Sequence, residues 1–382
     1  MDAMQAANLD RYWMQYCLRL AKQAAGYTSP NPMVGAVVVR EGRCVGKGFH
    51  PKPGEPHAEI FALREAGDLA AGATLYVNLE PCNHTGRTPP CTDALLKADI
   101  ARVVAGMVDP NPLVAGKGIA CLRQADVEVA VGVEESACRH LNEAFVHSIR
   151  HQLPFGILKY AMTLDGKIAT TTGHSQWISG IESRQVVHAQ RAVSDAVVVG
   201  SNTVRRDDPQ LTCRLAEGRN PLRVVLSRQL DLSTTAQLWD TRQAPTLVLT
   251  EPASGRQQEE RSHLLAFFER RQVEVIVVPK LTPMTAATVL HQRGCINLLW
   301  ECGATLAAAA LQAGAIQKVM AFVAPKFIGG KIAPGPIAGT GVSVMGSALR
   351  LENISDRPVG GDRLIEGYVT QPLSVESQPG KA

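Results

Sequence analysis

Two stretches decide the fold of the first half of this sequence: GEPHAE at residues 54–59 and EPCNHTGRTPPC at residues 80–91. A helical pattern follows the first stretch, so His57 and Glu59 lie at a helix start, where both side chains can converge on one site. The second stretch follows a buried-strand pattern, and we expect each of its two cysteines to open a helical turn. Free N–H groups at helix starts stabilise thiolates, which are the form that binds Zn²⁺.

The residue types in these stretches are typical of a catalytic zinc site. Three ligands are predicted: His57, Cys82 and Cys91. One imidazole and two thiolates leave the fourth tetrahedral position for a water, whose pKa zinc lowers toward neutrality. Glu59, which is not a ligand, can move protons from that water to a leaving amine. Zinc nucleobase deaminases share the patterns H-x-E and P-C-x-x-C, although eight residues separate the two cysteines here.

Length and composition indicate two globular domains. The chain has 382 residues, a length that exceeds the usual size of one core. Its residues are 45% hydrophobic and 19% charged, which is typical of a globular protein. Nine scattered cysteines suit thiols or metal ligands better than a disulfide framework. The net charge of +4 is spread without a basic stripe, which argues against a nucleic-acid partner and is compatible with a small anionic substrate. Because no long apolar run or secretory signal is seen, we expect no membrane partner and a cytoplasmic location.

Apolar periodicity predicts an α/β protein with a domain boundary near residue 153. We expect a first domain over residues 1–152, a second over residues 153–371 and a disordered tail over residues 372–382. In the first domain the predicted helices are 12–25, 58–66, 92–98 and 134–150, and the predicted strands are 34–39, 74–79 and 102–107. In the second domain the predicted strands are 155–161, 196–200, 222–226, 246–250, 273–278, 297–301 and 318–323.

These and further stretches resemble the bifunctional diaminohydroxyphosphoribosylaminopyrimidine deaminase/reductase family of riboflavin biosynthesis. The first domain carries SPNPMVG at 29–35, GEPHAE at 54–59, LEPC at 79–82, GRTPPC at 86–91 and DPNP at 109–112. The second domain carries KYAMTLDGK at 159–167, SQWI at 175–178, GSNTV at 200–204 and DDPQLT at 207–212. The resemblance implies a cytidine-deaminase-like three-layer α/β/α first domain and a dihydrofolate-reductase-like α/β second domain.

The resemblance also implies roles for single residues of the first domain. Glu59 would be the proton shuttle, beside a zinc ion held by His57, Cys82 and Cys91. The pyrimidine and its ribose phosphate would be held by Asn31, His50, His84, Arg87, Asp109 and Asn111. Asn, Asp and neighbouring Pro residues are also ordinary turn formers, so a purely local role stays open for Asp109 and Asn111.

The second domain by itself gives only a weak nucleotide signal. Gly303 follows the predicted strand 297–301 and precedes an alanine-rich helix, whose start favours a phosphate, but the Rossmann fingerprint is missing. The resemblance implies NADPH contacts from Ala161, Trp177, Thr203, Asp207, Ser227, Gly303, Ala304 and Thr305. It implies substrate contacts from Ser175, Arg191, Leu211, Arg214 and Glu301. Guanidinium groups suit the oxygens of a ribose phosphate.

The resemblance therefore implies two reactions, with Zn²⁺ and NADPH as cofactors, in a homo-oligomer. A zinc-dependent deamination of a pyrimidine ribose-phosphate would be followed by reduction of its ribosyl side chain. Several alternatives stay open. The zinc could be structural, closed by His50 or His84, or the three ligand residues could be unrelated. The target could also be a nucleic-acid base, with a second domain that is not catalytic.

Overall fold

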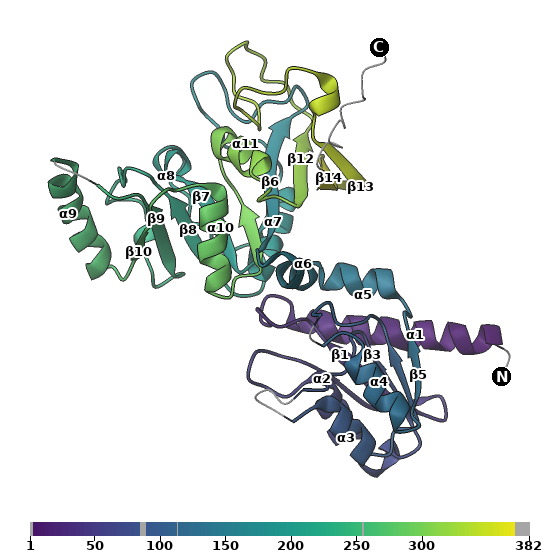
Figure 1. The fold of residues 1–382 in the computed structure, drawn as a ribbon. Coiled ribbons are helices and arrows are strands. Elements are labelled where there is room, and N and C mark those ends of the chain that lie inside the picture. Colours follow the sequence, from purple (N-terminus) through teal and green to yellow (C-terminus); the bar gives the residue numbers. More distant parts are fainter. Residues whose placement is uncertain (1–2, 85–88, 113, 254–255, 371–382) are drawn as a thin grey trace, which may run out of the picture. The chain divides into compact units, whose positions relative to one another are not determined.

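The computed structural model describes residues 3–84, 89–112, 114–253 and 256–370 of the chain (Figure 1). The chain divides into two compact units, Met1–Leu153 and Pro154–Ala382. Each unit has its own mixed sheet flanked by helices, which confirms the predicted α/β fold class. The predicted tail, residues 372–382, lies outside the described residues.

The first unit is built on a five-stranded sheet in the order β2-β1-β3-β4-β5. Strand β1 pairs antiparallel with β2 and β3, whereas β3, β4 and β5 are parallel. The strands are β1 (Gly35–Arg40), β2 (Arg43–Phe49), β3 (Thr74–Val77), β4 (Arg102–Ala105) and β5 (Glu128–Val131). The three central strands, β1, β3 and β4, are covered on both faces, so nearly all their side chains are apolar. Continuous apolar runs of this kind are visible in the sequence, and all three strands were predicted. The edge strands β2 and β5 are largely exposed, and the prediction missed both.

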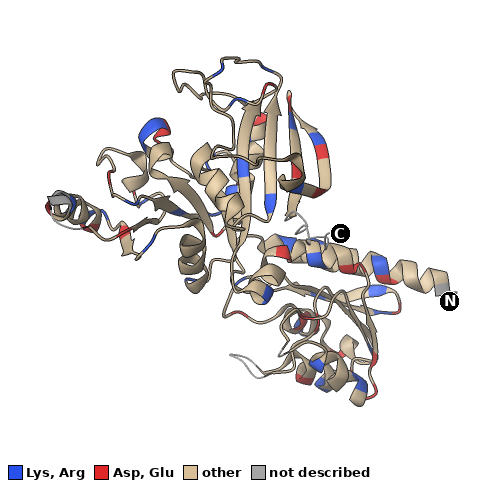
Figure 2. Ribbon diagram, turned by 45° about the horizontal axis from the view of Figure 1, so that its top comes forward, with Lys and Arg blue, Asp and Glu red and all other residues tan. Residues whose placement is uncertain are grey.

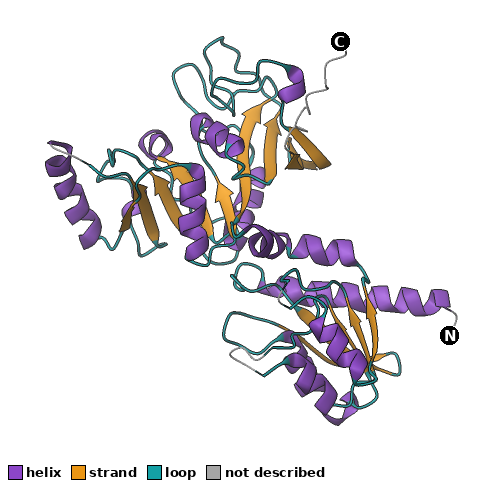
Figure 3. Cartoon of the chain, viewed as in Figure 1, coloured by secondary structure: helices purple, strands orange, loops and turns teal. Residues whose placement is uncertain are grey.

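Helices cover both faces of this sheet and give three layers (Figure 3). Helix α1 packs closely on Gly35, where an added Cβ would lie 2.2 Å from the Cys17 carbonyl oxygen. Gly48 pairs with Ala36, so it faces the opposite side, and an added Cβ there would lie 2.7 Å from the carbonyl oxygen of Ala58 in α2. The helices are α1 (Ala3–Ala21), α2 (Ala58–Ala66), α3 (Cys91–Lys97), α4 (Lys117–Gln124), α5 (Glu135–Leu141) and α6 (Glu143–His151), with 3-10 turns η1 (Lys22–Ala24) and η2 (Gly67–Ala70).

Two helices of the first unit differ from their predictions. Helix α1 begins at Ala3 rather than at residue 12. The predicted helix over residues 134–150 is two helices, α5 and α6, which meet at Asn142. The Asn142 side chain is buried, accepts the N–H of Met33 at 2.8 Å and donates to the Met33 carbonyl at 3.0 Å. This tertiary contact places the break, and helical periodicity carries no signal for it.

The second unit is built on a nine-stranded sheet in the order β10-β9-β8-β7-β11-β6-β12-β14-β13. Its first seven strands are parallel neighbours, and the β13–β14 hairpin adds two antiparallel strands at one edge. The strands are β6 (Phe155–Thr163), β7 (Ala196–Gly200), β8 (Leu222–Leu226), β9 (Thr246–Thr250), β10 (Glu274–Val277), β11 (Asn297–Trp300), β12 (Lys318–Ala324), β13 (Arg350–Val359) and β14 (Asp362–Thr370). All seven predicted strands of this half are found, and the hairpin was not predicted.

The helices of the second unit connect its parallel strands. They are α7 (Ile181–Val193), α8 (Ser201–Asp207), α9 (Arg256–Arg270), α10 (Pro283–Gln292) and α11 (Ala304–Gln312), with 3-10 turns η3 (Gln237–Trp239) and η4 (Met345–Ser347). None of the helices described in either unit is long and apolar enough to span a bilayer. Basic and acidic residues are interspersed along the ribbons of both units (Figure 2).

Candidate active sites

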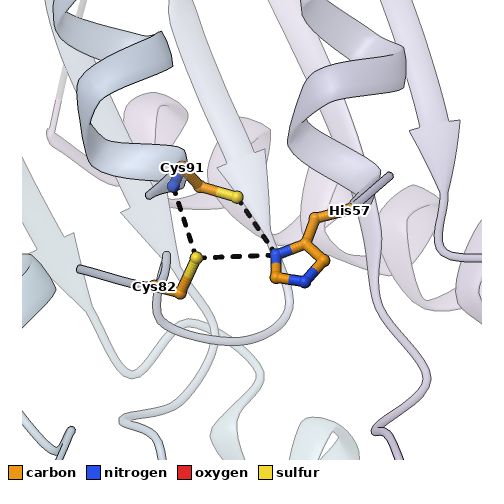
Figure 4. Close-up of side chains that lie close together, drawn as sticks. All are labelled: His57, Cys82 and Cys91. Atoms are coloured by element: carbon orange, nitrogen blue, oxygen red, sulfur yellow. Dashed lines mark hydrogen bonds between the residues drawn. The ribbon is translucent and has the colours of Figure 1, made fainter. Parts of the chain in front are cut away.

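Three side chains of the first unit meet where two helices begin beside the end of β3. His57 is the N-cap of α2, Cys91 is the first residue of α3, and Cys82 lies in the loop between β3 and α3. Their ligand atoms all lie within 4.8 Å of one another, and Figure 4 shows them facing a common point. The helix starts therefore bring together residues that are far apart in sequence.

The two sulfurs and the imidazole are already in contact. His57 Nδ1 lies 3.2 Å from Cys91 Sγ and 3.5 Å from Cys82 Sγ. The N–H of Cys91 donates to Cys82 Sγ at 3.3 Å. Cys82 does not open a helical turn as the sequence predicted. The first turn of α3 instead supplies an N–H to its sulfur, which has the same stabilising effect on a thiolate.

The cluster favours negative charge on sulfur. A hydrogen bond from Cys91 and the nearby His57 lower the pKa of Cys82, although burial opposes this. The same hydrogen bond and burial raise the pKa of Cys91. The hydrogen bond to Cys82 raises the pKa of His57. Two thiols that compete for one proton, beside an imidazole, are a donor set that a divalent soft cation would satisfy.

Glu59 lies in the first turn of α2 and is only 3% exposed. Its Oε2 atom is buried and has no hydrogen-bond partner among the described residues. Burial raises the pKa of this carboxyl group, and the neighbouring His57 opposes the shift. An unsatisfied buried carboxylate oxygen needs a polar partner, and a proton-carrying ligand held next to it would supply one.

The donor set fits zinc, and its geometry disfavours a fourth protein ligand. Within the described ranges, His57, Cys82 and Cys91 form the single group of three or more His, Cys, Asp or Glu residues close enough to hold a metal. His50 has both ring nitrogens engaged, Nε2 by Asn31 Nδ2 at 3.0 Å and Nδ1 by the Pro56 carbonyl at 3.1 Å.

The remaining polar residues predicted for this site fall into two places. Asn31 and His50 are hydrogen-bonded to each other, and the His50 and His57 ring centroids are 5.6 Å apart. Asp109 follows β4 and accepts the N–H of Asn111 at 2.8 Å. Burial raises the pKa of Asp109, and nearby His84 opposes that shift. Arg87 lies outside the described residues.

The second unit contains a cavity of about 450 Å³ along the ends of β6 and β11. Ten of the residues predicted to bind cofactor or substrate line it: Ala161, Ser175, Trp177, Arg191, Thr203, Asp207, Leu211, Arg214, Glu301 and Gly303. Three others are not among its lining residues. Ser227 follows β8 and is buried, while Ala304 and Thr305 form the first turn of α11 behind its N-cap Gly303.

Charge in this cavity is concentrated around Glu301. Arg191 donates to both oxygens of Glu301, through Nε and Nη2, and Lys159 Nζ lies 3.6 Å from Oε2. Burial alone would raise the pKa of Glu301, but these two cations outweigh it and lower the pKa to about 2. Burial together with Arg191 and Arg184 lowers the pKa of Arg214. Neighbouring guanidinium groups that repel one another in a cavity suit an anionic ligand.

One wall of the cavity is aromatic and open. The Trp177 side chain is 57% exposed, and the guanidinium carbon of Arg184 lies 4.3 Å from its ring centroid. Ser175 Oγ donates to Asp207 at 3.1 Å, so a predicted substrate residue and a predicted cofactor residue are adjacent. The cavity thus offers an aromatic face, hydrogen-bonding groups and cationic groups within one concave surface, which fits a nicotinamide nucleotide and a phosphorylated substrate.

Among the cavity residues that were not predicted from sequence are three basic ones: Lys159, Arg184 and His188. Lys159 is a lone cation inside the apolar strand β6, which is the signal that could have identified it. His188 is one helical turn before Arg191 on α7, and its Nδ1 accepts the N–H of Leu215 at 3.3 Å. Nothing in the sequence links α7 with that loop.

Comparisons with known proteins find matches for both units. The family described as the cytidine and deoxycytidylate deaminase zinc-binding region matches residues 7–107, and the RibD C-terminal domain matches residues 154–362. The riboflavin biosynthesis protein RibD of Synechocystis sp. is 56% identical over 360 residues, which are 94% of this chain and 96% of that protein. The chain belongs to the RibD family.

Solved RibD structures agree over nearly the whole length. Acinetobacter baumannii RibD, form 1, is 39% identical with a TM-score of 0.84, covering 96% of this chain and 100% of that one. A Thermotoga maritima deaminase/reductase is 35% identical with a TM-score of 0.82 and the same coverage. This RibD-family chain is a bifunctional riboflavin-biosynthesis enzyme, a deaminase and a reductase that use zinc and NADPH. A nucleic-acid deaminase with a non-catalytic second domain is not favoured, because the match includes the reductase domain.

Proposed function

We propose that the first unit deaminates 2,5-diamino-6-(5-phosphoribosylamino)pyrimidin-4(3H)-one and that the second reduces the ribosyl side chain of the product to give 5-amino-6-(5-phosphoribitylamino)uracil. The Thermotoga maritima relative is described as a diaminohydroxyphosphoribosylaminopyrimidine deaminase and 5-amino-6-(5-phosphoribosylamino)uracil reductase, which supports this substrate. The observation that carries the proposal is the cluster of His57, Cys82 and Cys91 next to the buried Glu59.

In the deaminase half, His57, Cys82 and Cys91 hold the metal and Glu59 moves protons. A zinc ion held by these three residues would supply a Lewis acid that lowers the pKa of water toward neutrality. Burial keeps a proton on Glu59 at higher pH than for an exposed carboxyl, which suits a group that takes a proton and then delivers it to departing ammonia. Asn31, His50, His84, Arg87, Asp109 and Asn111 hold the pyrimidine and its ribose phosphate.

In the reductase half, the cavity would hold NADPH, and the chemistry that this cofactor would supply is a hydride for the first carbon of the opened sugar. The residues that contact NADPH are Ala161, Trp177, Thr203, Asp207, Ser227, Gly303, Ala304 and Thr305. Ser175, Arg191, Leu211, Arg214 and Glu301 contact the substrate. Burial lowers the pKa of Lys159, so its ammonium group gives up a proton more readily than that of an exposed lysine. Its Nζ atom lies 3.6 Å from Glu301 Oε2 in the same cavity.

A coupled assay tests both halves on the zinc-loaded protein. Ammonia release and NADPH oxidation are followed with the diaminopyrimidine substrate, in the parent and in a Glu59→Gln variant. We expect both signals in the parent. The variant should keep its zinc, lose at least about 100-fold in ammonia release, and still oxidise NADPH when given the deaminated intermediate.

Two results would overturn parts of this proposal. Ammonia release without NADPH oxidation, even from the deaminated intermediate, would remove the reductase assignment. A lack of ammonia from this substrate in the zinc-loaded parent would remove the substrate assignment.

We infer further that the protein is a homo-oligomer in the cytoplasm. Large apolar side chains of the second unit are exposed in the segment before the β13–β14 hairpin, among them Phe327 at 77%, Ile332 at 79% and Met345 at 86%. Several large apolar side chains exposed in one segment favour burial against a second copy. Light scattering on the purified protein should give a mass of at least twice 41.0 kDa, and a Phe327→Glu, Met345→Glu double variant should lower it. Cell fractionation tests the location.

A further inference from the structure

The carboxylate of Glu80 ties a distant segment to the loop that carries Cys82. Glu80 lies two residues before Cys82 and is 4% exposed. Its two oxygens accept four backbone N–H groups: Oε2 from Asp109 at 3.1 Å and Gly116 at 2.9 Å, and Oε1 from Gly118 at 3.0 Å and Ile119 at 3.2 Å. The backbone N–H of Glu80 also donates to the Met107 carbonyl at 2.9 Å.

The four donors define a clasped segment, residues 109–112 and 114–119, which follows β4 and ends in the first turn of α4. Gly118 and Ile119 are in that first turn, where N–H groups have no partner within the helix. A carboxylate is the best acceptor for such groups, because it carries a full charge and the helix dipole adds to the attraction. Both oxygens are thus used by backbone alone.

A second observation shows how closely the clasped segment approaches the loop. An added Cβ on Gly118 would lie 2.1 Å from the Pro81 carbonyl oxygen, and the next nearest atom would be Glu80 Oε1 at 3.3 Å. The residue between Glu80 and Cys82 is therefore in backbone contact with α4. There is no room for a side chain at this crossing, which makes the position of the clasped segment depend on the loop.

The clasped segment begins with two residues assigned to the substrate. Asp109 donates its N–H to Glu80, and its side chain accepts the N–H of Asn111. Glu80 does not itself belong to the cluster of metal-ligand atoms. It is linked by two peptide bonds to Cys82 and by one hydrogen bond to Asp109, so it connects the metal-ligand cluster with the residues assigned to the substrate.

We propose that Glu80 is a positioning residue of the deaminase. It fixes the clasped segment against the Cys82 loop, so that Asp109 and Asn111 hold the pyrimidine at a constant distance from the metal ligands. This inference rests on the proposed substrate contacts of Asp109 and Asn111. It predicts that Glu80 affects the binding of substrate more than it affects zinc or the folding of the unit.

Glu80→Gln tests the proposal with the least change in shape. The amide NH₂ replaces one carboxylate oxygen and faces two N–H donors that it cannot bond, so one half of the clasp opens. We expect KM for the diaminopyrimidine to rise about 10-fold or more, with a smaller change in kcat and unchanged zinc content. NADPH oxidation with the deaminated intermediate should match the parent. Glu80→Asp keeps the charge, but its side chain is one methylene shorter. Its KM should therefore lie between those of the parent and of Glu80→Gln.

Asp10→Asn is the matched control, because Asp10 is a buried carboxylate of the same unit that serves only structure. It accepts the Tyr76 hydroxyl at 2.8 Å and both Arg102 Nη atoms at 2.8 Å. This variant should melt at a lower temperature than the parent and keep its KM. If Glu80→Gln does not fold, the KM of Glu80→Asp is judged by the same criterion.

Three outcomes would overturn the proposal. A KM within twofold of the parent would reduce Glu80 to a purely structural residue, and an equal rise in Asp10→Asn would show that any destabilisation has this effect. Loss of zinc in Glu80→Gln would show that the residue acts on Cys82 instead. If the zinc-loaded parent releases no ammonia from this substrate, the proposed function fails, and this result is independent of every Glu80 variant.

Discussion

Glu301 is held by two cations in the reductase cavity, and its charge is needed to balance them. The pair with Arg191 is nearly buried, with side-chain exposures of 11% and 8%. Removing one partner of such a pair leaves an uncompensated buried charge, which typically lowers stability by about 3–5 kcal/mol. We expect Glu301→Gln to lower the free energy of unfolding of the second unit by this order and to slow NADPH oxidation at least about 100-fold, while ammonia release is kept.

Glu274→Gln is the matched control for that variant. Glu274 pairs with Arg293 at 2.6 Å, but both side chains are more than a third exposed. An exposed ion pair contributes about 0–1 kcal/mol, so this change should leave both stability and activity near the parent. Chemical denaturation followed by the two enzyme assays distinguishes the two variants. Equal effects from both would contradict the role given to the Glu301 charge.

His188 makes the same unit sensitive to acid. Burial first, and then Arg191 and Arg214, lower its pKa to about 4 from the usual 6.5. Because the folded pKa is the lower one, the unfolded chain binds the proton more tightly. The stability from neutral His188 is therefore complete above pH 6.5 and is lost as the pH falls from 6.5 toward 4.

A His188→Gln variant tests this pH dependence, since its amide oxygen can still accept the Leu215 N–H. Thermal midpoints of the second unit should be measured from pH 7.5 to pH 4.5, with pH steps of about half a unit. The parent should lose more stability than the variant over this window. Parallel curves would mean that His188 does not titrate as its surroundings require.

At the level of elements, strand β6 depends on a glycine for its packing. An added Cβ on Gly156 would lie 1.9 Å from the Ala315 carbonyl oxygen, which is backbone and has little freedom to move. Overpacking of this kind typically lowers stability by about 1–3 kcal/mol. We expect Gly156→Ala to do so, whereas Gly361→Ala, with no atom within 4 Å of the added Cβ, should stay within about 0.5 kcal/mol of the parent. Both variants are unfolded with denaturant while the reductase activity is followed, and the midpoints are compared with that of the parent.

The central elements were predictable from sequence because their burial is continuous. β7, β8 and β9 were predicted with their observed bounds, since parallel strands covered on both faces are unbroken apolar runs. The hairpin β13–β14 was missed because β13 is almost entirely exposed and has no clear apolar alternation. Edge strands of this kind form through pairing with a neighbour, and that information is not local.

The site residues also divide into those that a local sequence pattern predicts and those that depend on distant contacts. His57 and Cys91 were predictable because each stands at a helix start whose pattern is local. The predicted helical turn at Cys82 was wrong, since that loop is shaped by its contacts with α3 and the clasped segment. Glu80, Lys159 and His188 contact partners between 27 and 142 residues away in sequence, and these contacts form only once the sheet is assembled.

At the scale of the whole molecule, the two reactions belong to two units with separate sheets and cores. Chelation of zinc should therefore abolish ammonia release and leave NADPH oxidation with the deaminated intermediate unchanged. Metal that binds only the folded state also stabilises it, so the melting of the first unit should shift to lower temperature while that of the second does not. Added Zn²⁺ should restore both properties. A parallel loss of NADPH oxidation after chelation would show instead that the reductase depends on the metal of the first unit.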